Sequence, residues 1–179
     1  MNDILKRVGE EKDFLKKILE KIPGFNGYVE RAERWLADKL LRESIAEQFE
    51  ALWGRISTIQ RKAISDGNIE LIDELEAPAL KLRQFIDRIR TASYGYAGFF
   101  DAIKVKTEEL NEIYKYDYVL LALGEEVAEA VDNVELSMGS NDFTAALGHL
   151  TKLAQDCIDA FEKRKDVIVS MSESSVQPE

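Results

Sequence analysis

The chain has 179 residues, of which 45% are hydrophobic and 32% are charged, and its formal net charge is −10. This length suits one domain with a core large enough to fold without disulfides or a structural metal, and the composition favours a helix-rich globular protein over a disordered or β-rich one. The acidic balance argues against nucleic acid as a partner, because binding to a phosphate backbone depends on Lys and Arg.

The same survey predicts a cytoplasmic protein. No window approaches the roughly eighteen apolar residues that a membrane span requires, and the first residues do not combine a basic flank with an unbroken apolar run. The single cysteine, Cys157, cannot form an internal disulfide, which agrees with a reducing compartment.

Apolar residues recur at spacings of three and four along nearly the whole chain, the pattern of amphipathic helices. They predict a single domain over residues 1–169, followed by a flexible tail at 170–179 that is rich in serine and lacks periodic apolar positions. The expected helices span about 3–21, 28–65, 68–92, 107–138 and 141–169.

The first of these segments mixes lysines and carboxylates beside a moderately apolar face and ends before Pro23. An amphipathic helix of this kind can lie on a membrane surface, although the near-balance of its charges weakens attraction to anionic lipid. Docking on its own bundle or on a second copy is the alternative that the charge balance favours.

The second and third segments predict a helical hairpin. A seam of apolar residues spaced 4-3-4-3-4 runs through the second, and the turn Asp66–Asn68 offers Gly67 for a left-handed cap and Asn68 as the next N-cap. Pro78 is expected to kink or restart the third segment. Because the second helix is longer than the third, it must bend or overhang.

These patterns together predict an all-α fold. Seams in every long segment and short connections favour an antiparallel, up-and-down bundle of about five helices, one of them long, with crossings near twenty degrees.

One segment, residues 93–100, is not explained by helical packing, because it combines four aromatic residues with two glycines. It forms a candidate interaction surface together with two aromatic residues of the 23–28 loop, and the six candidates are Tyr94, Tyr96, Phe99, Phe100, Phe25 and Tyr28. Alternatively, Tyr94, Phe99 and Phe100 form a structural plug that closes the end of the bundle over Phe25 and Tyr28, because large aromatic side chains are usually at least partly buried.

The fourth segment has two unusual seam positions, Asp117 and Gly124. A carboxylate on a seam pairs with an arginine such as Arg88 or Arg90, caps the aromatic segment, or marks a stretch that faces solvent. We expect structural pairing, with Asp117 and Arg88 as the candidate buried polar residues. The many other carboxylates of this segment are expected to form a solvated acidic face.

No catalytic motif, metal site or cofactor site is expected. A ferritin-like centre requires Glu-x-x-His pairs, and the only histidine, His149, has Ala146 three residues before it. His149 is expected at a helix edge, and Cys157 falls on an apolar stripe, where an inert buried thiol is expected.

Three stretches resemble a family of uncharacterised bacterial helical proteins. They are Ile22–Tyr28, with its Ile-Pro-Gly-x-x-Gly-Tyr pattern, Ala37–Arg42, and Asp87–Lys104, which contains Tyr-Gly-Tyr-Ala-Gly-Phe-Phe-Asp-Ala. The resemblance covers about half of the chain and implies a bacterial, cytoplasmic helical protein without supplying functional residues. A weaker likeness is to long-helix membrane-stress proteins that act on bilayers.

Two functions follow as expectations. The first is a non-enzymatic protein-interaction or structural module whose partner is another protein or a second copy of the chain. The second is a peripheral membrane or envelope-stress factor that uses the amphipathic segment 3–21.

Overall fold

The computed structural model describes residues 14–27, 34–92 and 107–175, and every regular element in these ranges is a helix. The helices are α2 (Phe14–Lys21), α3 (Arg34–Ser65), α4 (Glu70–Thr91), α6 (Thr107–Ser137) and α7 (Phe143–Ser175). The predicted all-α class is confirmed.

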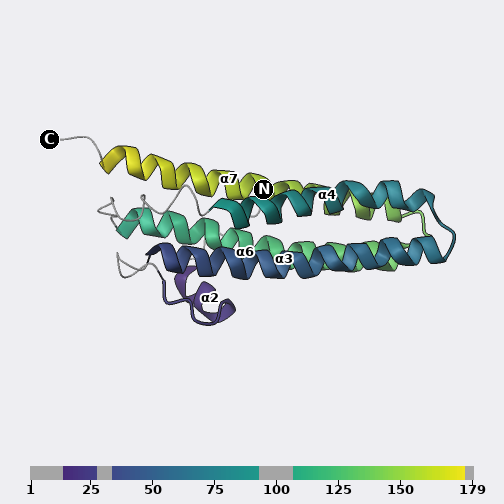
Figure 1. Ribbon diagram of the computed structural model, residues 1–179, viewed down its shortest axis with the longest axis horizontal. Coiled ribbons are helices and arrows are strands. Elements are labelled where there is room, and N and C mark those ends of the chain that lie inside the picture. The colour runs from purple at the N-terminus through teal and green to yellow at the C-terminus, as the bar shows by residue number, and fades with distance from the viewer. Residues whose placement is uncertain (1–13, 28–33, 93–106, 176–179) are drawn as a thin grey trace.

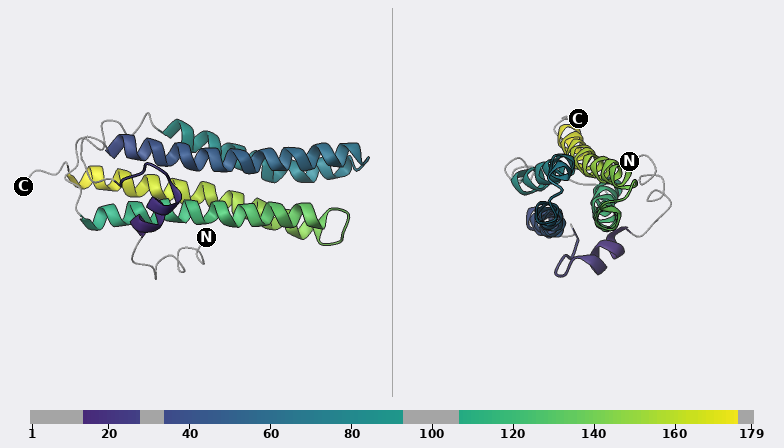
Figure 2. Two further views of the ribbon diagram at one scale, coloured as in Figure 1. Left: turned by 90° about the horizontal axis from the view of Figure 1, so that it is seen from below. Right: turned by 90° about the vertical axis from the view of Figure 1, so that its right-hand side faces the viewer.

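The four long helices form an antiparallel bundle, with α2 outside it (Figure 1). Seen along the bundle, α3 contacts α4, α4 contacts α7, α7 contacts α6, and α6 returns to α3, so that α3 and α7 lie diagonally opposite (Figure 2). The two tight connections, α3–α4 and α6–α7, lie at the same end, which we call the turn end.

Aromatic rings tie three of the helices together in the core. Phe85 of α4 packs edge-on against Phe49 of α3, with ring centroids 4.6 Å apart, and against Phe161 of α7 at 6.2 Å. Edge-to-face pairs at these distances contribute beyond their burial. The seam of α3 that the spacing predicts, from Ile45 to Ala63, is buried throughout.

The α3–α4 turn confirms the predicted reversal but not its cap. Gly67 has a φ of 80°, and the amide hydrogen bonds from Gly67 to Ile64 and from Asn68 to Ala63 form a Schellman motif. The N-cap of α4 is Ile69, without a side-chain cap, so the assignment of Asn68 as the cap was wrong. The carbonyl of Asn68, not its side chain, accepts the amide of Leu71.

Two other boundaries differ from the predictions. Helix α4 includes Pro78, which is buried, so the helix does not restart there. Helix α7 continues to Ser175 and so takes up most of the predicted tail at 170–179. Helix α3 has 32 residues and α4 has 22, and α3 overhangs α4 at the end opposite the turns.

Helix α2 packs on α6 with most of its apolar face. Ile18 is fully buried, Phe14 stacks near Tyr118 with ring centroids 5.9 Å apart, and the Lys17 ammonium lies 5.1 Å from the same ring. Lys21 forms an ion pair with Glu125. Among the described helices, none combines the length and apolar character needed to cross a membrane.

Candidate functional site

Four charged side chains lie in the core at the end opposite the turns. We call them the buried charge network: Asp38, Arg42, Asp117 and Arg164. Each is at most 2% exposed, and they come from α3, α6 and α7. Moving an unpaired ion from water into the core costs a large desolvation free energy. This end of the bundle is therefore stable only if the four charges pair with one another.

Arg164 is the centre of the network. Its Nε donates to Asp117 Oδ1 at 2.5 Å, and its Nη2 donates to Asp38 Oδ1 at 2.6 Å. The guanidinium therefore joins α7 to α6 and reaches across the diagonal of the bundle to α3. Hydrogen bonds between ionised partners at these distances are among the strong ones in proteins.

The network continues from α3 to the end of α4. Arg42 Nε donates to Asp38 Oδ2 at 2.7 Å, and its Nη1 donates to the Ile89 carbonyl at 2.9 Å. Ile89 lies in the last turn of α4, where carbonyls lack partners within the helix and a cation is favoured by the helix dipole. All four long helices are thus joined through one chain of charged groups.

The apolar seams of three helices lead directly to these charges. Extending the seam of α3 backwards by the same spacing reaches Arg42 and Asp38, and extending the seam of α7 forwards from Phe161 reaches Arg164. Asp117 was recognised from its seam position, but the other three were missed because their seams were ended at the last apolar residue. The spacing itself was the signal that could have found them.

The expected partners of Asp117 were wrong. Arg88, a candidate buried residue, is 40% exposed at its side chain and pairs with Glu162 at 2.8 Å. Arg90 pairs with Glu50 at the surface. The reason is rotational: both arginines lie on the flanks of α4, whereas its core-facing positions there are Phe85, Ile86 and Ile89. Asp117 is fully buried, as expected of a structural pair.

The network is chemically balanced. Two carboxylates face two guanidiniums, and both carboxylates accept hydrogen bonds from an arginine. Such an arrangement holds α3, α6 and α7 together in the core. No cluster of three or more potential metal ligands occurs in the described part of the chain.

The aromatic candidates lie mostly outside the described residues. Five of the six lie outside the residues that the structure describes: Tyr28, Tyr94, Tyr96, Phe99 and Phe100. Phe25 is 2% exposed and is part of the hydrophobic core, which corrects its assignment to an interaction surface. It is buried because Gly24 and Gly27, both with a φ of 82°, turn the loop back onto the bundle.

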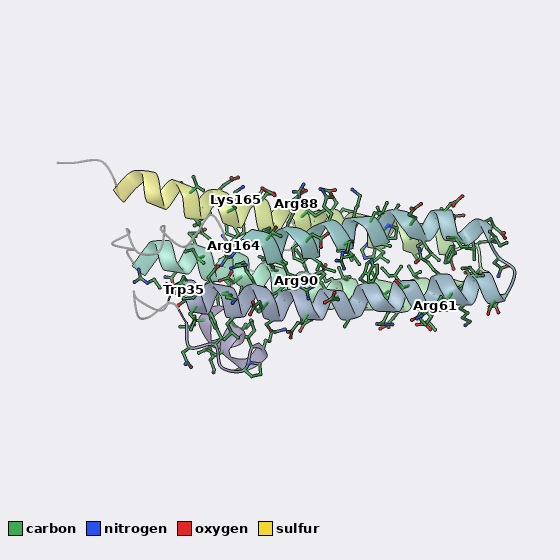
Figure 3. All side chains as sticks on the ribbon, in the orientation of Figure 1. Trp35, Arg61, Arg88, Arg90, Arg164 and Lys165 are labelled. Carbon is green, nitrogen blue, oxygen red and sulfur yellow. The ribbon has the colours of Figure 1, made fainter. Side chains whose placement is uncertain are left out.

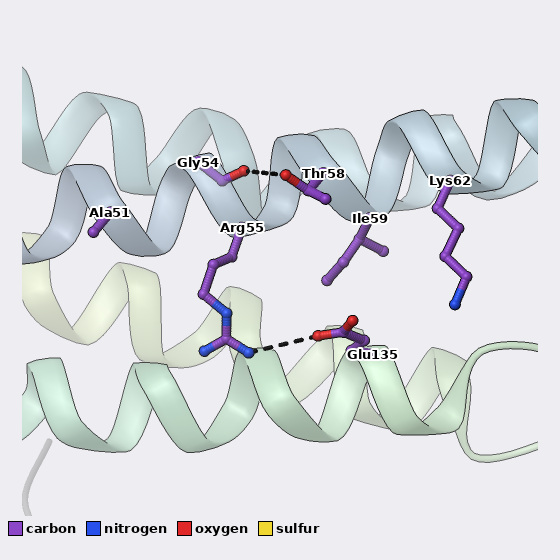
Figure 4. Close-up of a pocket in the computed structure, with 7 residues that line it drawn as sticks. All are labelled: Ala51, Gly54, Arg55, Thr58, Ile59, Lys62 and Glu135. Atoms are coloured by element: carbon purple, nitrogen blue, oxygen red, sulfur yellow. Dashed lines mark hydrogen bonds and ion pairs between the residues drawn. The ribbon is translucent and has the colours of Figure 1, made fainter.

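A groove of about 360 Å³ lies between α3 and α6 near the turn end (Figure 4). Its α3 wall includes the small residues Ala51 and Gly54. Arg55 spans the groove and pairs with Asp132 and, at 3.6 Å, with Glu135. Part of the predicted acidic face of α6 is therefore neutralised by cations of neighbouring helices.

Cys157 and His149 lie where the sequence predicted them. Cys157 is fully buried, and burial raises the pKa of its thiol well above the ordinary value, which disfavours the reactive thiolate. His149 is exposed on α7.

Gly124, the second unusual seam position, is explained by a close contact between α3 and α6. A Cβ at this position would come within 3.0 Å of the Gln48 side chain. The glycine therefore makes room for a polar side chain of α3 beside the seam.

Comparisons with protein-family models, with curated proteins and with solved structures find no match to this chain.

Proposed function

We propose that this chain is a non-enzymatic protein-interaction and structural module built on the four-helix scaffold. The buried charge network supports this proposal, because its four charged side chains bond to one another and to the backbone of α4. Their arrangement fixes helices in place and offers no reacting group to a substrate.

A second feature supports binding at the same end of the bundle. Trp35 and Leu36, in the overhanging first turns of α3, are 43% and 52% exposed. Tryptophan is enriched at protein interfaces, where its large surface contributes much of the binding energy. From the resemblance to bacterial helical proteins we further propose that the module is bacterial and acts in the cytoplasm.

The alternative, a peripheral membrane or envelope-stress factor, receives less support from the described part of the N-terminal segment. Helix α2 uses its apolar face on α6, and Lys17 and Lys21 face Tyr118 and Glu125. A helix that binds lipid through its apolar face would first have to leave this position.

Comparative capture tests the proposal. Wild type, Trp35→Ser/Leu36→Ser and Tyr94→Ser/Tyr96→Ser would be expressed at native level, and the proteins each recovers from lysate quantified, with thermal melts of each. Leu136→Ser is the matched control, because Leu136 is 84% exposed at the turn end. We expect one partner to be lost from at least one of the two double variants, with unchanged melting, and retained by the control. Recovery of no specific protein by the wild type would contradict the interaction function.

A further inference from the structure

The hairpin tip of α3 and α4 has an uneven distribution of charge. Residues 51–65 of α3 contain three basic residues and no acidic one, whereas residues 66–80 contain five acidic residues and no basic one. The two arms of the hairpin thus carry opposite charge at the turn end, within a chain whose net charge is −10.

Exposed apolar side chains accompany these charges. Ile64 on α3 is 56% exposed, Ile69 at the start of α4 is 66% exposed, and Leu80 is 61% exposed. Single exposed apolar residues are common, but here three large ones occur within one hairpin tip.

Helix geometry places these residues on one face. Ile64 follows Trp53 by eleven residues, about three full turns, so both lie on the same side of α3. Trp53 packs against Arg83 of α4, with the guanidinium 5.6 Å from the ring centroid. Ile64 therefore lies on the side of α3 that borders α4, and Arg61 is its neighbour one turn earlier.

The α4 half of this face is a single stripe. Ile69, Asp73, Glu76 and Leu80 are spaced by four, three and four residues, and all are exposed. Glu76 precedes Arg83 by two turns, and Arg83 contacts α3, so Glu76 is on the edge of the stripe that lies nearer to α3. We call this surface the tip face, and its members are Arg61, Ile64, Ile69, Asp73, Glu76 and Leu80.

The charges of the tip face are not used within the bundle. Arg61 donates to the Thr58 hydroxyl at 2.9 Å, but no ion pair joins Arg61, Asp73 or Glu76 to another described residue. Arg61 points away from the bundle near the turn end (Figure 3). The tip face has a cation at one edge, carboxylates at the other edge and isoleucines between them. A two-fold axis through the isoleucines would place the cation of each copy opposite the carboxylates of the other, so the face is complementary to itself.

We propose that the tip face binds the tip face of a second copy of this chain in a two-fold symmetric dimer, which identifies one partner of the proposed interaction module and rests on that function. Arg61 of each copy faces Asp73 and Glu76 of the other, around a centre formed by Ile64 and Ile69. The surface is small and both copies are acidic, so the dimer is weak and concentration-dependent.

Sedimentation equilibrium of the full chain over about a hundredfold range of concentration measures this association. We expect the wild type to approach dimer mass at high concentration, and Arg61→Glu to raise the dissociation constant about tenfold or more, because like charges then oppose each other across the interface. Asp73→Arg/Glu76→Arg has the same effect. Lys165→Glu is the matched control: it makes the same charge change at an exposed position near the opposite end (Figure 3) and leaves association unchanged.

Mixing the two charge-reversed variants provides the decisive test of the dimer. When Arg61→Glu is mixed with Asp73→Arg/Glu76→Arg, both sets of contacts regain opposite charges, and we expect a heterodimer of wild-type affinity. Circular dichroism melts establish that each variant is folded. A wild type that stays monomeric, or variants that fail to recover on mixing, would overturn the dimer. Neither result bears on the capture experiment with Trp35 and Leu36, which decides the interaction function separately.

Discussion

Arg42 Nη1 donates a hydrogen bond to the Ile89 carbonyl at 2.9 Å, so a buried side chain of α3 caps the end of α4. The same guanidinium is held by Asp38, which is held in turn by Arg164 of α7. The position at which α4 ends is therefore linked to the packing of the diagonal pair of helices.

Replacing Arg42 with Met should loosen the last turn of α4 and lower the free energy of unfolding by roughly 3 kcal/mol, because one partner of a buried ion pair is removed. Urea unfolding measures the loss, and hydrogen exchange should become faster at the amides near Ile89. Arg90→Met is the control, since Arg90 pairs with Glu50 at the surface in the same turn. If both variants have the same unfolding midpoint, the cap has no special role.

Asp117 and Arg164 should be strongly coupled. Asp117→Leu leaves the buried Arg164 with one fewer carboxylate and should lower the free energy of unfolding by about 3 kcal/mol or more. Asp117→Leu/Arg164→Met removes one charge of each sign, so it should recover most of that loss in the free energy of unfolding. A double-mutant cycle by urea unfolding gives the coupling energy. Additive losses would show that the pair is not an energetic unit.

The helices were predictable because each buries one stripe, and the stripe is visible in the sequence as a repeating spacing. Asp117 was visible as an exception on such a stripe. Its partner was not, because the register between α6 and α7 depends on where the α6–α7 turn ends, and a shift of one helical turn would select another residue. The seam positions of Asp38, Arg42 and Arg164 were available in the spacing, but only the fold shows that three seams bring their charges to the same level.

Substitution by alanine should change the stability of the protein in opposite directions at two of its glycines, Gly148 and Gly67. Gly148 is in the interior of α7 with no atom within 4 Å of an added Cβ, so Gly148→Ala should stabilise the protein by about 0.5 to 1 kcal/mol through helix propensity. Gly67→Ala should destabilise it by about 1 kcal/mol, because Gly67 has a φ of 80°. Thermal and urea unfolding of both variants measure the two signs, and the same sign in both would contradict the assignment.

Cys157 should make the protein less stable in alkali. Burial raises the pKa of its thiol in the folded state, while the unfolded thiol ionises near its ordinary pKa of about 8.5. Above that pH the unfolded state binds fewer protons than the folded state, so the contribution to stability that is fully present at lower pH declines as the pH rises.

The comparison with Cys157→Ala isolates this contribution. The variant should be less stable at every pH because it leaves a small cavity, but it should lose less stability than the wild type between about pH 7.5 and about pH 9.5, where only the wild type has a thiol to ionise on unfolding. Urea unfolding at both pH values gives the difference. Tyrosines and lysines titrate in both proteins and cancel in the comparison, so equal losses would mean that the thiol ionises as readily in the core as in the unfolded chain.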